Sequence, residues 1–325
     1  MKKTGKKNQR EDAINGKDEK AGETVQRVPV NFGLQFSDLW ENPELVLTNM
    51  ATSISKAGRA IPEFLLAKFP YVQAISLIML LAERALKMEK YPPMHPHLIY
   101  GIAVVCFITG CMMTAKIKLR FATLVYSAVL VYLTINAYTN RQFNYSRHVR
   151  NRIASRHAGC LGVYLIYSFI KSNRQSNLIH RIGELCISAY LLGSAYLINE
   201  SYEDKRAVLE NIPGGNYARY FLTIIFTCAG LCFISGYFLR DISMSMAFLI
   251  GAITILVDMK FSYWSYRGMA YWNQMRIVID NLNLLTGFFV FMIHYENIAR
   301  AEAEAIQRAK EQEEQESDEE HDKQE

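Results

Sequence analysis

Long uncharged runs alternate with short charged segments through the middle of the chain. The clearest run, residues 220–239, reads "YFLTIIFTCAGLCFISGYFL" and contains twenty residues without a charge. A helix needs about 20 residues to cross a hydrocarbon core about 30 Å thick. A buried helix of a water-soluble domain would show a polar stripe at helical spacing, and this run shows none. The pattern therefore predicts a transmembrane helix.

Seven further runs are also candidates for transmembrane helices, and they differ in length and in whether they contain a charge. Four of them are long, and they cover residues 98–114, 121–138, 182–198 and 242–257. Three are shorter or contain a charge, and they cover residues 69–82, 158–170 and 277–295. Basic side chains near a helix end can extend to the lipid headgroups, so these three also count as spans. The sequence predicts an all-α polytopic membrane helix bundle of about eight transmembrane helices, with both termini on one face.

The two ends of the chain differ in composition from its middle. Residues 1–30 carry eight basic and five acidic side chains with almost nothing apolar, and such a segment cannot offset the entropy of ordering. Residues 296–325 hold twelve acidic and four basic residues, and their first half is rich in helix formers. We predict a polar, largely disordered tail over residues 1–60 with a possible surface helix, a membrane domain over 61–295, and an acidic tail over 296–325 that is helical before it becomes disordered.

Charge alone does not orient the predicted bundle. The short loops carry nearly equal numbers of Lys and Arg on its two faces, whereas cytoplasmic loops usually hold the excess. Two glycosylation sequons, at Asn144 and Asn199, lie on the face away from the termini. They favour cytosolic termini.

An aromatic stretch, "FSYWSYRGMAYWNQM" at residues 261–275, separates the last two predicted spans. Taken as one helix, it would place Trp264, Tyr271 and Trp272 on a shared face. Trp and Tyr gather at membrane interfaces because each ring is apolar at one end and hydrogen-bonds at the other. We predict an interfacial aromatic belt, and the alternative is a wall that recognises a ligand.

Four segments resemble the transmembrane protein 101 family in sequence, order and spacing over roughly residues 65–295. They are "AERA" at 82–85, "EDKRAVLENIPGG" at 203–215, "FISGYF" at 233–238 and "SYWSYRGMAYWNQMRI" at 262–277. The resemblance implies a multi-pass membrane protein, and it implies a role in activating NF-κB signalling. The long charged tails depart from the family pattern, so the resemblance does not extend to them.

Acidic residues inside predicted spans are the candidate polar sites, because a charge in a membrane is costly and usually functional. They are Glu83, Glu184, Asp258 and Asp280. Each has a basic residue within about one turn: Lys87, Arg181, Lys260 and Arg276, in that order. Two interpretations follow. Either these are locally paired acids near the membrane interface, or two or more of them share a polar cavity.

The sequence contains no nucleophile elbow, HExxH, nucleotide fingerprint or third ligand for a metal. We predict a protein without catalytic, cofactor or metal residues, whose partners are the lipid bilayer and, through the tails, other proteins, and not nucleic acid. The main functional hypothesis is a scaffold or signalling modulator. The alternative is a small-solute carrier or cargo receptor with a polar intramembrane cavity.

Overall fold

The computed structural model describes residues 60–86, 96–139, 147–171 and 177–322, and these residues form helices and turns without any strand. The predicted N-terminal tail and its surface helix lie outside them. Eight long helices match the eight predicted runs. They are α3 (Phe69–Leu86), α4 (Pro96–Thr114), α5 (Leu119–Thr139), α6 (Arg147–Lys171), α7 (Asn177–Glu200), α9 (Gly215–Ser235), α10 (Leu239–Ile253) and α12 (Tyr271–Asp322). The all-α fold predicted from the hydrophobic pattern is confirmed.

Three short elements join the long helices on one side of the bundle. They are α8 (Tyr202–Asn211), the π-helix η2 (Thr254–Asp258), which continues α10, and α11 (Phe261–Tyr266). Ser201 begins α8 as its N-cap, and its hydroxyl accepts a hydrogen bond from the Asp204 backbone N–H at 3.3 Å. Glu203 and Asp204 lie in the first turn, where negative charge is favoured by the helix dipole.

The outer surface of the bundle is apolar. Phe221 and Ile224 on α9 are 62% and 61% exposed, and Phe248 on α10 is 61% exposed. Among the described residues, seven helices are long and apolar enough to cross a membrane. Exposed apolar side chains on such helices are what a bilayer requires.

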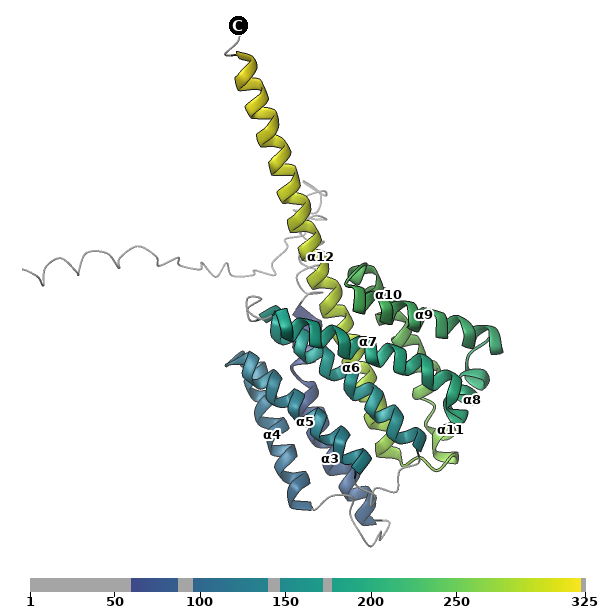
Figure 1. Cartoon of the computed structure of the whole chain (residues 1–325). Helices are drawn as coiled ribbons and strands as arrows, with labels where there is room; N and C mark the ends of the chain where they lie inside the picture. The colour runs from purple at the N-terminus through teal and green to yellow at the C-terminus, as the bar shows by residue number, and fades with distance from the viewer. Residues whose placement is uncertain (1–59, 87–95, 140–146, 172–176, 323–325) are drawn as a thin grey trace, which may run out of the picture. The chain divides into compact units, whose positions relative to one another are not determined.

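Helix α6 is the one long helix that is not among these seven, because its N-terminal half is basic. It packs against α5, α7 and α12 (Figure 1), so its polar half is buried in protein. The contact with α7 is close: a Cβ added at Gly162 would lie 2.7 Å from the Gly183 carbonyl oxygen. The predicted span over residues 158–170 is the C-terminal half of this longer helix.

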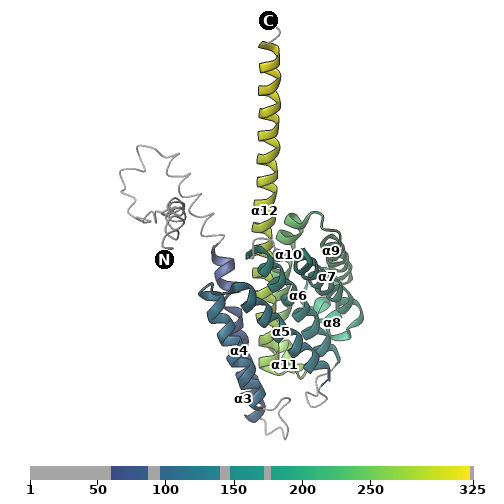
Figure 2. The same cartoon turned by 60° about the vertical axis from the view of Figure 1, so that its left-hand side comes forward.

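The start of α3 and the C-terminal extension of α12 leave the bundle on the same side (Figure 2). We call this side the C-terminal face. Here Lys171 Nζ lies 2.7 Å from Glu63 Oε2, which joins the end of α6 to the segment before α3. The opposite face carries α8 and α11, and there Glu83 accepts the Trp272 backbone N–H at 3.1 Å.

Helix α12 runs without a break from the bundle into a projecting segment (Figures 1 and 2). Its 52 residues correspond to a rod of about 78 Å at 1.5 Å per residue. Arg308 Nη2 lies 3.3 Å from Glu304 Oε2, four residues earlier on the same helix. The helix predicted for the start of the acidic tail continues to Asp322.

Candidate functional site

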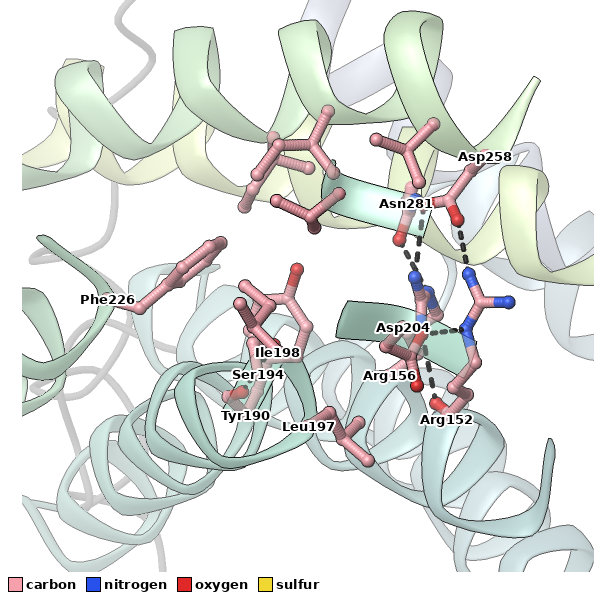
Figure 3. Close-up of a pocket in the computed structure, with 14 residues that line it drawn as sticks. Arg152, Arg156, Tyr190, Ser194, Leu197, Ile198, Asp204, Phe226, Asp258 and Asn281 are labelled. Atoms are coloured by element: carbon pink, nitrogen blue, oxygen red, sulfur yellow. Dashed lines mark hydrogen bonds and ion pairs between the residues drawn. The ribbon is translucent and has the colours of Figure 1, made fainter. Parts of the chain in front are cut away.

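A cavity of about 60 Å³ lies between α6, α7, α8, α9, α10 with η2, and α12. Figure 3 shows charged and amide groups on one side of it and Phe226 on the other, with Tyr190 between them. The polar wall is formed by Arg152, Arg156, Asp204, Asp258 and Asn281. We call these five side chains the ionic network.

Arg152 and Asp258 are the two most buried charged members of the ionic network, each with 1% of its surface exposed. The Arg152 guanidinium contacts both aspartates. Its Nε lies 3.0 Å from Asp204 Oδ1 on α8, and its Nη2 donates to Asp258 Oδ1 at the end of η2. One guanidinium therefore ties α6 to two elements that are distant in sequence.

Arg156 lies one turn further along α6 and faces the other side of the same carboxylate. Its Nη2 is 3.0 Å from Asp258 Oδ2, and its Nε donates to Asn281 Oδ1 at 2.8 Å. Asn281 Nδ2 in turn donates to Asp258 Oδ2 at 2.6 Å. Asp258 thus receives hydrogen bonds from two arginines and one amide, a geometry that repays the cost of burying its charge.

The π-helix turn positions Asp258 for these contacts. The Met259 N–H donates to the Thr254 carbonyl, five residues back, at 2.8 Å. A π-turn of this kind is rare and is frequently found at functional sites. At its end, Trp264 Nε1 donates to the Val257 carbonyl at 3.0 Å, and Gln274 Nε2 donates to the Asp258 carbonyl. Side chains from α11 and α12 therefore satisfy carbonyls that the helix end leaves free.

Trp264 is a core residue in this chain, because only 1% of its surface is exposed. Its ring lies under the Arg152 guanidinium, with 4.0 Å between the Arg152 Cζ and the ring centroid. Such a cation–π contact is strongest where water is excluded. The indole thus covers the ionic network instead of facing lipid.

The aromatic stretch does not form the single helical face that its sequence predicts. Helix α11 ends at Tyr266, Gly268 has a φ of +77°, and α12 begins only at Tyr271. A left-handed φ suits glycine and interrupts a helix. As a result Trp264 points inward, Tyr271 is 45% exposed and Trp272 is half-buried. Of the three, Tyr271 has the most exposure for an interfacial contact.

Glu83 lies on α3 and contacts the first turn of α12. Its carboxylate oxygens accept the backbone N–H groups of Tyr271 at 3.3 Å and Trp272 at 3.1 Å. A carboxylate at a helix N-terminus satisfies free N–H groups and is favoured by the dipole. Lys87, its partner expected from sequence, lies outside the described residues.

The remaining two candidate acids lie away from the cavity. Glu184 is 2% exposed and accepts from Arg181 Nη1 at 2.9 Å, which is the local pair expected from its sequence. Asp280 is 4% exposed, and its Oδ2 lies 3.7 Å from His157 Nε2. Asp258 alone of the four lines the cavity, and its partners are Arg152 and Arg156 instead of Lys260.

Four members of the ionic network were not among the candidates predicted from the sequence: Arg152, Arg156, Asp204 and Asn281. The two arginines and the aspartate lie between predicted runs, and Asn281 lies inside the last run. The available signal was the four-residue spacing in "RNRIASR", which places both guanidiniums on one face once the segment is helical. Their partners come from segments at least 52 residues away, as 204 minus 152, so no local pattern pairs them.

A second ionic contact joins α8 to α11 outside the network. Arg267 donates to Glu203, and its guanidinium lies 4.4 Å from the centre of the Tyr263 ring. The aromatic stretch therefore contacts α8 at two points: Trp264 through the ionic network, and Arg267 through Glu203.

Two side chains near this contact have shifted pKa values. Burial raises the pKa of Tyr263 to about 12. On the surface of α8, a hydrogen bond from Arg206 holds the pKa of Glu210 below its usual range.

The side chain of Asn199, the asparagine of one glycosylation sequon, forms hydrogen bonds inside the bundle. Its amide nitrogen donates to the Ala195 carbonyl at 2.8 Å and to Thr223 Oγ1 at 2.9 Å. An asparagine bonded in this way at a helix–helix contact is a poor glycosylation acceptor. Asn199 therefore no longer supports the inference that the termini are cytosolic. Asn144, the other sequon, lies outside the described residues.

Across the described ranges, no group of three or more His, Cys, Asp or Glu is placed to hold a metal ion.

Apolar helices long enough to span a bilayer, an exposed apolar surface and a buried ionic network define a multi-pass helical membrane protein. The chain matches the TMEM101 protein family over residues 51–294 and belongs to that family. This range contains every residue of the ionic network and the whole aromatic stretch. The family resemblance seen in the sequence is confirmed. No solved structure matches the chain.

Proposed function

We propose that this protein is a non-enzymatic membrane scaffold or signalling modulator whose output surface is the projecting part of α12. The observation that carries the proposal is the continuity of α12, which holds Asn281 in the ionic network and reaches Asp322 as one helix. A helix transmits a shift along its axis, and displacements of 1–2 Å are common in switching proteins.

The two ends of α12 suit different tasks. Inside the bundle, Gln274 and Asn281 bind the Asp258 main chain and side chain. Beyond Glu296, the described side chains are almost all exposed, and the segment from 296 to 325 has a net charge of −8 from twelve acids and four bases. A surface of one charge steers association with a partner of opposite charge.

The signal we propose is activation of NF-κB, following the family resemblance drawn from the sequence. In this proposal the C-terminal face is cytosolic, and the partner is a protein with a basic surface. A change in the ionic network or its cavity alters the position of α12, and the partner reads that change at the projecting segment.

An NF-κB reporter in cells that express matched variants tests this function. Ala303→Pro breaks the projecting helix, since proline removes one hydrogen bond and clashes with the preceding turn. Ala303→Ser at the same position is the control. We expect the proline variant to lose reporter activation at equal membrane abundance, while the serine variant retains it. Full activation by a chain that lacks residues 296–325 would rule out the projecting segment as the output.

The cavity beside the ionic network favours a second candidate function, a small-solute carrier or cargo receptor. Polar and ionisable groups buried among membrane-spanning helices commonly mark substrate or ion pathways. Purified protein in liposomes, tested for flux of labelled glycerol and urea, distinguishes the two. Flux that Asp258→Asn abolishes in protein shown to be folded by size-exclusion chromatography, and that Asp241→Asn, at an exposed site on α10, leaves intact, would favour the carrier.

A further inference from the structure

The cavity next to the ionic network has walls of opposite character. Arg152, Arg156 and Asp258 form one wall, while Ile198, Phe226 and Ile250 form the other. The last three are buried apolar residues from α7, α9 and α10. A ligand that satisfies both walls needs a polar group at one end and a hydrocarbon group at the other.

The polar wall carries no net charge, because two guanidiniums face two carboxylates. Arg152 binds both Asp204 and Asp258, and Arg156 binds Asp258. An anion or a cation bound here would add a buried charge that no group of opposite sign balances, which is unfavourable in a site with little water. The wall therefore favours an uncharged polar group.

Tyr190 supplies hydrogen-bonding capacity that the protein uses only in part. It is 5% exposed and lines the cavity between the two walls (Figure 3). The Ser194 side chain lies within hydrogen-bonding reach of its hydroxyl, and its carbonyl separately accepts from Ser155 and Ser194. A phenolic hydroxyl can both donate and accept, so a bond with Ser194 leaves one of these roles open. Buried polar groups are nearly always bonded, so a ligand hydroxyl or carbonyl is a fitting partner.

The size of the cavity limits the ligand. About 60 Å³ is less than half the volume of about 150 Å³ that accommodates benzene in an engineered apolar cavity. The occupant is therefore a short molecule, or the polar end of a longer one.

We propose that this cavity binds a small uncharged amphiphile, a short-chain alcohol or carbonyl compound whose polar group bonds to Tyr190 and whose hydrocarbon part lies against Phe226 and Ile250. The cavity is the one on which the carrier candidate rests, but binding requires neither transport nor signalling. Its test is therefore separate from both.

The test uses the full chain in lipid nanodiscs and, as photolabel, a diazirine-bearing butanol, of which the hydroxyl end is the part that fits the cavity. Mass spectrometry of the cross-linked peptides locates the label, and unlabelled butanol competes with it. The matching diazirine carboxylate and amine compare head groups of different charge. We expect saturable labelling of α7, α9 or α10 at cavity-lining residues by the alcohol, and at least several-fold weaker labelling by both charged analogues.

Three variants locate the site. Ser194→Phe fills the cavity and should abolish the saturable label, while Ala189→Phe, at an exposed position of the same helix, should leave it unchanged. Tyr190→Phe keeps the shape of the ring and removes only the hydroxyl. It should weaken competition by butanol about two- to tenfold, as expected for one hydrogen bond.

Several outcomes would overturn the proposal. Labelling confined to lipid-facing residues, or labelling that Ser194→Phe does not reduce, would show that the alcohol binds elsewhere. Preferential labelling by the carboxylate or the amine would show that the network presents a net charge to the ligand. Tyr190→Phe is nearly isosteric, so this variant should fold even if Ser194→Phe does not. Unchanged competition by butanol in folded Tyr190→Phe protein would show that the Tyr190 hydroxyl does not bind the ligand.

Discussion

The guanidinium of Arg152 lies over the indole ring of Trp264, with 4.0 Å between the Arg152 Cζ and the ring centroid. These residues are 112 positions apart, as 264 minus 152, and they belong to α6 and α11. The stack excludes water from a guanidinium that also binds Asp204 and Asp258. Lower local dielectric strengthens both ion pairs. Trp264 thus stabilises the network by covering it.

Removing the Asp258 carboxylate should destabilise the bundle strongly. Asp258→Asn leaves Arg156 without a counter-ion and Arg152 with only Asp204, and breaking a buried ion pair costs about 3–5 kcal/mol. The free energy of unfolding, measured by SDS titration in mixed micelles, checks this. Asp241→Asn, at an exposed site on α10, is the control and should change stability by less than about 0.5 kcal/mol. Equal stability of the two variants would mean that the network is not structural.

The two tryptophans of the aromatic stretch should differ sharply in their contribution to stability. Trp264→Ala removes a fully buried ring and its hydrogen bond to Val257, which should cost about 3–5 kcal/mol. Trp272 is half-buried, so Trp272→Ala should cost roughly 1 kcal/mol. Thermal unfolding in detergent at matched protein concentration measures both. Similar, mild losses would instead support a shared interfacial belt.

The crossing of α6 and α7 should tolerate no side chain at Gly162. A Cβ there would approach the Gly183 carbonyl oxygen to 2.7 Å, and the backbone cannot rotate away as a side chain can. Gly162→Ala should lose about 1–3 kcal/mol. Gly101→Ala on α4, where nothing lies within 4 Å of the added Cβ, should be neutral or gain up to about 1 kcal/mol. A neutral Gly162→Ala would contradict the close helix contact.

Acid should weaken the fold through His148, which lies in the first turn of α6. Burial is the largest influence on this imidazole, and it lowers the pKa below the usual 6.5. The unfolded chain therefore takes up the proton more readily, and the contribution of His148 to stability is lost as the pH falls through about 6.5. We expect the unfolding midpoint to drop between pH 7.5 and 5.5, and to drop less in His148→Gln. An identical drop in both proteins would assign the effect to other groups.

The distal parts of both tails should be dispensable for membrane insertion. Residues 1–30 offer almost no apolar surface, and the described side chains of residues 299–312 are all exposed. A chain that lacks residues 1–30 and 311–325 should be expressed and extracted from membranes like the full chain. Detergent extraction followed by size-exclusion chromatography measures this. Aggregation of the shortened chain would mean that a tail packs on the bundle.

Hydrophobic pattern was enough to predict the long helices, because burial in lipid imposes the same requirement on every residue of a span. The run over residues 220–239 corresponds to α9, and each of the other seven runs corresponds to one long helix, with the run over 242–257 continuing from α10 into η2. Local pairs were also accessible: Glu184 and Arg181 lie three residues apart and meet at 2.9 Å. In each case the relevant interaction lies within one helix.

The inward turn of Trp264 and the assembly of the ionic network were decided only by tertiary structure. A break at Gly268 rotates Trp264 away from Tyr271, and the sequence of the stretch reads equally well as one helix. Arg152 meets Asp204 and Asp258 because α6, α8 and η2 converge at the opposite face. The sequence determined which residues are costly to leave unpaired in a membrane. Only the packing of distant helices decided their partners. The attraction between two charges depends on their distance in space and not on how far apart they lie in the sequence.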